Sequence, residues 1–177
     1  CDTLLFNTIS EVAYFIGPTD IYSSSNYMYC ENGWYNTQTD ISQFNKNAYL
    51  QNKNQKLFGD SLFYDKNIGY GVAIKNVQVE DTINNYLING HRAEIYEEND
   101  SSIITDETLL TLLFDSDTLY LHADTITATL DSLNSRTIKA FKGVKFYSNN
   151  LQGKCKYLNY YKGDSTIQMY IDPVLWS

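Results

Sequence analysis

The side chains of this 177-residue chain that could do chemistry form no recognisable catalytic or metal-binding motif. Its two histidines, His91 and His122, belong to no Cys-x-x-Cys, His-Glu-x-x-His or Gly-rich phosphate motif. A metal pair formed by both is the alternative to two isolated histidines on a polar strand face. The segment 115–117 (Asp-Ser-Asp) resembles the start of a calcium loop, but it lacks the glycine and the distal glutamate. Because no nucleophile has an adjacent base, the sequence predicts a non-enzyme that holds no metal and no cofactor.

The three cysteines all occupy one position of a pattern that occurs six times. An apolar or small residue follows this position after three residues, and usually an aromatic or aliphatic one after five. Successive copies lie 29 to 33 residues apart, a period that indicates stacked structural units. Elsewhere the position holds Gly or Ala, so we expect the cysteines to be buried free thiols, with a Cys1–Cys30 disulfide as the alternative. We call it the small position; its members are Cys1, Cys30, Gly59, Gly90, Ala123 and Cys155.

A second series of turn-prone residues alternates with the small positions. The sequence of each unit therefore predicts two strands, a tight turn and a bend. In the third unit, for example, we expect strands at 57–64 and 70–79 around a turn at 65–67. The 16 Tyr and 8 Phe also favour strands. Segment 108–114 could form two helical turns, but its place between a bend and the next strand favours an extended conformation. We call this second series the turn position; its members are Gly17, Asn47, Asn76, Asp106, Gly143 and Asp172.

The spacing after the small position predicts a bent sheet with a shared interior. In a flat strand, alternate residues face opposite sides, so apolar residues three and five positions after the small position indicate a bulge or sharp bend there. We therefore expect an all-β stack of about six bent antiparallel hairpins, curled so that one face of every unit lines a common groove. The residues expected to line it are Leu4, Phe6, Tyr35, Leu62, Tyr64, Ala93, Ile95, Ile126, Leu158 and Tyr160.

Composition and charge exclude several classes of protein. A net charge of −8 without any basic run excludes a nucleic-acid partner. The sequence contains no stretch of about 18 apolar residues, so it predicts no transmembrane helix. Cys1 lies in the middle of a unit and Ser177 lies in mid-strand, so we expect residues 1–177 to be one repeat-built domain from a longer array. The open ends of such a stack favour strand addition by a further copy or a partner.

Several segments of the repeat resemble the OstA family, and more closely the OstA-like proteins of the Bacteroidetes. These segments are 57–66 (LFGDSLFYDK), 69–73 (GYGVA), 75–77 (KNV), 117–125 (DTLYLHADT) and 151–155 (LQGKC), and the resemblance covers all six units. The family is similar to the periplasmic lipopolysaccharide transport protein A and to the N-terminal domain of the outer-membrane assembly protein D. The resemblance implies a β-jellyroll, also called a β-taco, folded over an apolar groove.

The resemblance also implies a function in the periplasm, in association with the outer membrane. A protein of this family would carry lipopolysaccharide, or another acylated lipid, with its acyl chains inside the groove. It would stack end to end with other lipopolysaccharide-transport proteins or with further copies of itself. One alternative is a scaffold or adaptor of the outer-membrane assembly machinery, filled by its own aromatic side chains and acting by edge-to-edge assembly without a lipid. Another is surface carbohydrate binding, which requires exposed tyrosines on the outer face.

Overall fold

The chain folds into one long antiparallel meander. The computed structural model describes residues 1–22, 26–51, 53, 55–83, 85–114, 117–130 and 135–177, which form thirteen strands and no helix. The strands are β1 (Thr3–Asn7), β2 (Val12–Tyr22), β3 (Tyr27–Asn36), β4 (Ile41–Gln51), β5 (Gln55–Asp65), β6 (Tyr70–Asp81), β7 (Tyr86–Tyr96), β8 (Ser101–Leu113), β9 (Thr118–Leu130), β10 (Arg136–Tyr147), β11 (Gln152–Tyr161), β12 (Thr166–Tyr170) and β13 (Val174–Trp176).

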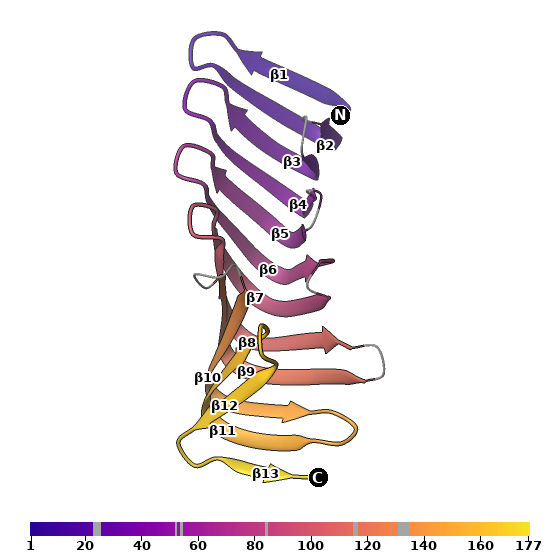
Figure 1. Cartoon of the computed structure of the whole chain (residues 1–177). Helices are drawn as coiled ribbons and strands as arrows, with labels where there is room; N and C mark the ends of the chain where they lie inside the picture. The colour runs from indigo at the N-terminus through magenta and orange to yellow at the C-terminus, as the bar shows by residue number, and fades with distance from the viewer. Residues whose placement is uncertain (23–25, 52, 54, 84, 115–116, 131–134) are drawn as a thin grey trace.

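Strands β1 to β12 lie in chain order, each paired with its sequence neighbours, and β13 pairs with β11. Figure 1 shows the strands stacked from β1 at one end to β13 at the other, with the two termini at opposite ends. Residues 108–113 belong to β8, which confirms the extended conformation expected for this segment. The predicted all-β stack of antiparallel hairpins is confirmed.

Tight four-residue turns close the hairpins along one margin of the sheet, at 8–11, 37–40, 66–69, 97–100 and 162–165. The Asn7 side-chain oxygen accepts hydrogen bonds from the backbone N–H groups of Ile9 and Ser10 at 2.9 and 3.0 Å. Asn36 repeats this arrangement one hairpin later. Such side-chain capping explains why these turns form where the sequence places Asn.

The bends occur at the turn positions. All six adopt a left-handed backbone, with φ between +50° and +85°, which Gly and Asn tolerate best. Between the register pairs Asn45↔Ser61 and Ala48↔Gly59, β4 contains two residues and β5 only one, which is a β-bulge. The extra residue therefore lies in the strand that carries the turn position. The expectation of a bulge at the small position is therefore wrong, because the small position Gly59 lies opposite Ala48, the residue that follows the bulge.

Each bend divides its strand, so the sheet has two walls. The first wall contains the strand halves beside the 8–11, 37–40, 66–69, 97–100 and 162–165 turns, and the second wall contains the other halves. Side chains from both walls form one hydrophobic cluster that draws on β3 to β11. Ile104 and Ile126 from the first wall, and Ile88 and Leu110 from the second, are fully buried in it. The core is thus the space between the walls.

Candidate functional site

The residues expected to line the groove form two adjacent cross-strand rows on the inner face of the first wall. The first row runs through Leu4, Phe15, Gly33, Phe44, Leu62, Ala73, Ala93, Ile104, Ile126, Ala140, Leu158 and Met169. The second row runs through Phe6, Ala13, Tyr35, Ser42, Tyr64, Gly71, Ile95, Ser102, Ala128, Ile138, Tyr160 and Ile167. We call these the inner rows. All ten residues expected from the sequence belong to them.

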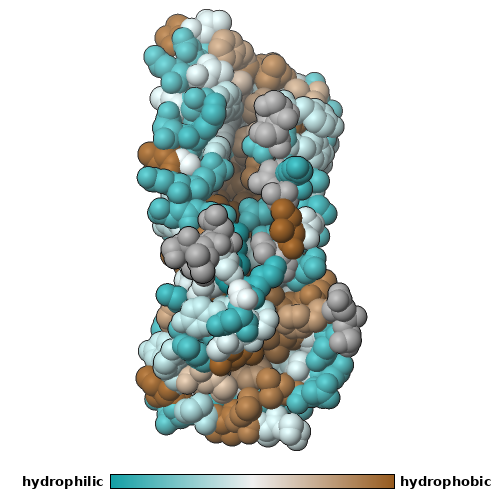
Figure 2. All heavy atoms as spheres, in the orientation of Figure 1, coloured by the Kyte–Doolittle hydropathy of each residue, from teal (hydrophilic) through white to brown (hydrophobic). Residues whose placement is uncertain are grey.

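Exposure changes along the inner rows. At the β1 end, Leu4 and Phe6 are 55% and 51% exposed, whereas Leu62, Ile126 and Leu158 are buried. The upper half of Figure 2, which contains β1 to β6, shows hydrophobic side chains at depth between hydrophilic margins. The interior is therefore open at the β1 end and filled by the protein's own side chains in the middle of the stack, from Phe44 on β4 to Leu158 on β11, whereas Ile167 and Met169 on β12 are again only partly buried.

The tyrosines of the second inner row combine an inward ring with a polar tip at the margin. The Tyr64 hydroxyl donates to Glu97 in the 97–100 turn at 3.0 Å, and burial together with this carboxylate raises the pKa of Tyr64 to about 12. The Tyr35 hydroxyl donates likewise to Asp40 in the 37–40 turn, and this hydrogen bond lowers the pKa of the Asp40 carboxyl. These contacts give the interior a polar rim.

An ion pair joins the two walls across their margins. Arg136 begins β10 on the first wall, Asp81 ends β6 on the second, and a guanidinium nitrogen of Arg136 lies 3.8 Å from a carboxylate oxygen of Asp81. Their side chains are only 5% and 2% exposed. Arg136 also donates to the backbone carbonyl of Asp100 at 2.9 Å and to its carboxylate at 3.2 Å. The sequence did not predict this contact, although Arg136, Ile138 and Ala140 lie two residues apart on one strand and therefore point to the same, inner side of the sheet.

The cysteines are free thiols, and two of the three are buried. Burial raises the pKa of Cys30 and Cys155, so both act as small apolar side chains. The expectation of burial is wrong for Cys1, which is exposed because register pairing begins only at Thr3. The alternative of a Cys1–Cys30 disulfide is not realised.

Steric crowding explains the small position at Gly90. A Cβ atom there would lie 2.6 Å from the Cγ2 atom of Ile104 and 3.0 Å from the carbonyl oxygen of Thr105. The first distance is shorter than real Cβ atoms essentially ever show, and the second is tighter than most real Cβ contacts.

Among the described residues, no three His, Cys, Asp or Glu side chains lie close enough together to hold a metal ion. His91 places Nδ1 3.2 Å from the carbonyl oxygen of Asp106, and His122 is exposed on β9. Asp115 and Ser116 of the calcium-like segment lie outside the described residues. Within the same described ranges, a helix suited to crossing a membrane is absent.

The bent, two-walled antiparallel sheet places the molecule in the class of LptA-like β-jellyrolls, and two comparisons with known proteins agree. The profile of the OstA-like protein family matches residues 1–60. The fold is similar to that of LptH, the LptA homologous periplasmic component of the lipopolysaccharide transport device of Pseudomonas aeruginosa. The TM-score is 0.62 at 10% sequence identity, over 70% of this chain and 94% of LptH. No curated protein matches the sequence.

Proposed function

We propose that this chain is a non-catalytic periplasmic module that binds the acyl chains of lipopolysaccharide between its two walls and carries the lipid toward the outer membrane. The observation that supports the proposal best is the first inner row, which is apolar at all twelve positions from Leu4 to Met169. Each acyl methylene removed from water against such a surface contributes about 0.8 kcal/mol. The likeness to LptH supports the same function.

The polar rim suits an amphipathic ligand. An acyl chain along the inner rows would leave the sugar hydroxyls of the lipid at the margin, where the Tyr64 hydroxyl and the Glu97 carboxylate lie. The candidate contacts are the inner-row residues Leu4, Phe6, Tyr35, Leu62, Tyr64, Ile95, Ile126, Leu158 and Tyr160.

Photo-crosslinking at β1 tests this proposal, because three successive residues there are equally exposed but face opposite sides. Leu4 and Phe6 lie in the inner rows, whereas Leu5, 54% exposed, pairs with Tyr14 on the outer face. A photoreactive phenylalanine at position 4 or 6 should give lipopolysaccharide adducts in cells, and the same probe at position 5 should give few or none. Equal adducts from all three positions, or protein adducts alone, would contradict lipid binding by the inner rows.

The β1 end also suits the proposed partners. Among the strands that the structure describes, β1 pairs with β2 alone, and its apolar side chains are more than half exposed. An edge strand of this kind favours strand addition by another lipopolysaccharide-transport protein or a further copy. Crosslinks between protein chains from position 5 are the expected sign of such pairing.

A scaffold that acts without lipid is the second candidate, and the filled middle of the interior favours it. Ile104 and Ile126 have no exposed surface, so no ligand contacts them in this conformation. A scaffold predicts that association between copies persists while positions 4 and 6 give no lipid adduct. Sedimentation of the purified chain over a range of concentrations, combined with the crosslinking above, separates the two candidates.

A further inference from the structure

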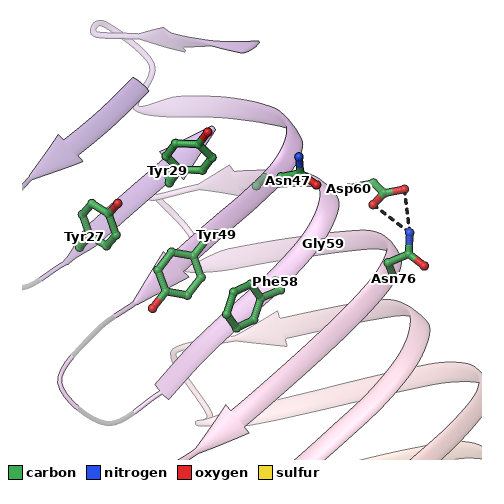
Figure 3. Close-up of a pocket in the computed structure, with 9 residues that line it drawn as sticks. Tyr27, Tyr29, Asn47, Tyr49, Phe58, Gly59, Asp60 and Asn76 are labelled. Atoms are coloured by element: carbon green, nitrogen blue, oxygen red, sulfur yellow. Dashed lines mark hydrogen bonds between the residues drawn. The ribbon is translucent and has the colours of Figure 1, made fainter. Parts of the chain in front are cut away.

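The outer face of the second wall carries a cluster of aromatic side chains that the interior does not need. Tyr27 and Tyr29 are two residues apart on β3 and therefore share a face. Tyr29 is the register partner of Tyr49 on β4, and Tyr49 is the partner of Phe58 on β5. The inward residues between them, such as Met28, pack against the core instead. We call Tyr27, Tyr29, Tyr49 and Phe58 the aromatic shelf (Figure 3).

The rings of the shelf support one another. The centroids of Tyr49 and Phe58 lie 4.4 Å apart with 31° between the ring planes, and Tyr27 meets Tyr49 edge-on at 5.7 Å. The Tyr27 hydroxyl donates to Asp20 at 2.7 Å, which fixes the ring further. All four rings remain partly exposed, so they form an ordered apolar surface that still contacts solvent.

A hollow of about 320 Å³ lies against the shelf and is bordered by amide and carboxylate groups from the bends. Asn47 and Asn76 occupy two successive bulges, and their left-handed backbones place them at the hollow together with Asp60. The Asn76 amide donates to both carboxylate oxygens of Asp60 at 3.0 and 3.1 Å, as the dashed lines in Figure 3 show. The Asn47 amide donates to Glu31 at 2.8 Å. Rigid apolar rings therefore lie beside polar groups that are already held in place.

This combination matches the chemistry of a sugar ring. A pyranose has a face of C–H groups, and covering that face with an aromatic ring is favourable because it removes apolar surface from water. The hydroxyls around the ring need hydrogen-bond partners. Planar amides and carboxylates supply such partners. The volume of the hollow lies at the lower end of the roughly 300–1,000 Å³ typical of small-ligand sites, which suits a mono- or disaccharide unit.

The charge of the hollow selects among sugars. None of the nine described residues that line it is Lys or Arg, and one of them is Asp60. Glu31 lies next to the hollow through its bond to Asn47. A phosphorylated or uronic sugar would meet only negative side chains among these residues, so an uncharged sugar is favoured.

We propose that the aromatic shelf and the polar groups of the adjacent bends bind a neutral oligosaccharide on the outer face of the second wall. This site is separate from the inner rows and does not depend on lipid binding there. A neutral sugar segment of a lipopolysaccharide molecule and a free neutral glycan share the chemistry that the shelf recognises.

Isothermal titration calorimetry and saturation-transfer NMR with purified chain test the proposal. The probes are maltotriose, cellotriose, a neutral core oligosaccharide of lipopolysaccharide freed of its phosphate groups and its carboxylic sugar acids, and tri-galacturonate as the anionic comparison. At least one neutral probe should bind, and tri-galacturonate should bind at least about tenfold more weakly. The source is a lipopolysaccharide sugar if only the core oligosaccharide binds, and a free glycan if maltotriose or cellotriose binds as well or better.

Matched variants locate the binding. Tyr29→Ala and Tyr49→Ala should each weaken binding of the neutral probe at least about tenfold. Tyr147→Ala, which removes an exposed ring from β10, should leave the affinity unchanged. Circular dichroism establishes that each variant is folded, and Asn76→Gly, which retains the left-handed backbone, supplies a milder change if an alanine variant is not. Absence of binding by every neutral probe, tighter binding of tri-galacturonate, or equal affinity in the Tyr29→Ala and Tyr147→Ala variants would overturn the proposal.

Discussion

Replacing Arg136 with methionine should lower the free energy of unfolding by about 3–5 kcal/mol, because it removes the guanidinium from a buried carboxylate. The guanidinium nitrogen and the Asp81 carboxylate oxygen lie 3.8 Å apart, and both side chains are almost fully buried. At this distance and an effective dielectric constant of about 20, Coulomb attraction between unit charges is about 4 kcal/mol. The neutral donors that remain at Asp81, including the Ile83 N–H at 3.0 Å, do not replace this attraction.

Urea unfolding followed by far-ultraviolet circular dichroism measures the loss, and Lys142→Met is the matched control. Lys142 pairs with Asp124 at 3.3 Å, but both side chains are well exposed, so its removal should cost no more than about 1 kcal/mol. Adding Asp81→Asn to Arg136→Met should restore part of the stability, because the buried negative charge that Arg136 neutralised is then gone. The reasoning is refuted if Arg136→Met and Lys142→Met shift the unfolding curve equally, or if the double variant is less stable than Arg136→Met.

Three further outcomes follow from the packing. Gly90→Ala should lower the free energy of unfolding, measured with urea, by about 1–3 kcal/mol because the added Cβ would overlap a neighbouring strand. Gly59→Ala, whose Cβ would have its nearest contact at 3.3 Å, should cost less. Equal losses in the two variants would contradict the crowding at Gly90. Iodoacetamide at pH 8 should alkylate the exposed Cys1 quickly and Cys30 only on unfolding, because Cys30 is buried and burial raises the pKa of its thiol. Mass spectrometry of the labelled peptides measures both rates, and similar rates would contradict the prediction. The pKa of Tyr64 is raised from 10.0 to about 12, so the stability that its neutral hydroxyl contributes is present below pH 10 and is lost as pH rises toward 12. In the Tyr64→Phe variant, the unfolding temperature should therefore fall less steeply between pH 10 and 12. An unchanged pH profile would contradict this contribution.

The repeat predicted most of the fold because its two positions encode backbone geometry directly. Gly and Asn tolerate a left-handed backbone, and the structure has positive φ at every turn position. The strand that carries each bulge was harder to assign. An extra residue changes the facing of both paired strands, so apolar spacing in β5 alone does not show that the bulge lies in β4.

The inner rows could be predicted for the same reason, but their exposure could not. Leu4 and Ile126 occupy equivalent places in the pattern, yet one is half exposed and the other fully buried. This difference depends on how closely the two walls approach, and that distance depends on contacts between residues remote in sequence. The contact of Arg136 with Asp81, 55 residues away in the chain (136 minus 81), is one of these. The aromatic shelf escaped notice because the small and turn positions mark the bends and do not show which tyrosines face outward.

The burial gradient and the Arg136–Asp81 pair together constrain how a lipid would use the interior under the proposed function. A ligand beside β1 and β2 meets apolar side chains that are already exposed, so its binding requires no separation of the walls. A ligand beside β6 to β10 must part the walls, which separates the buried Arg136–Asp81 pair and the side chains packed between the walls. Under the proposed function, an acyl chain beside β1 and β2 therefore requires less rearrangement of the walls than one in the middle of the stack.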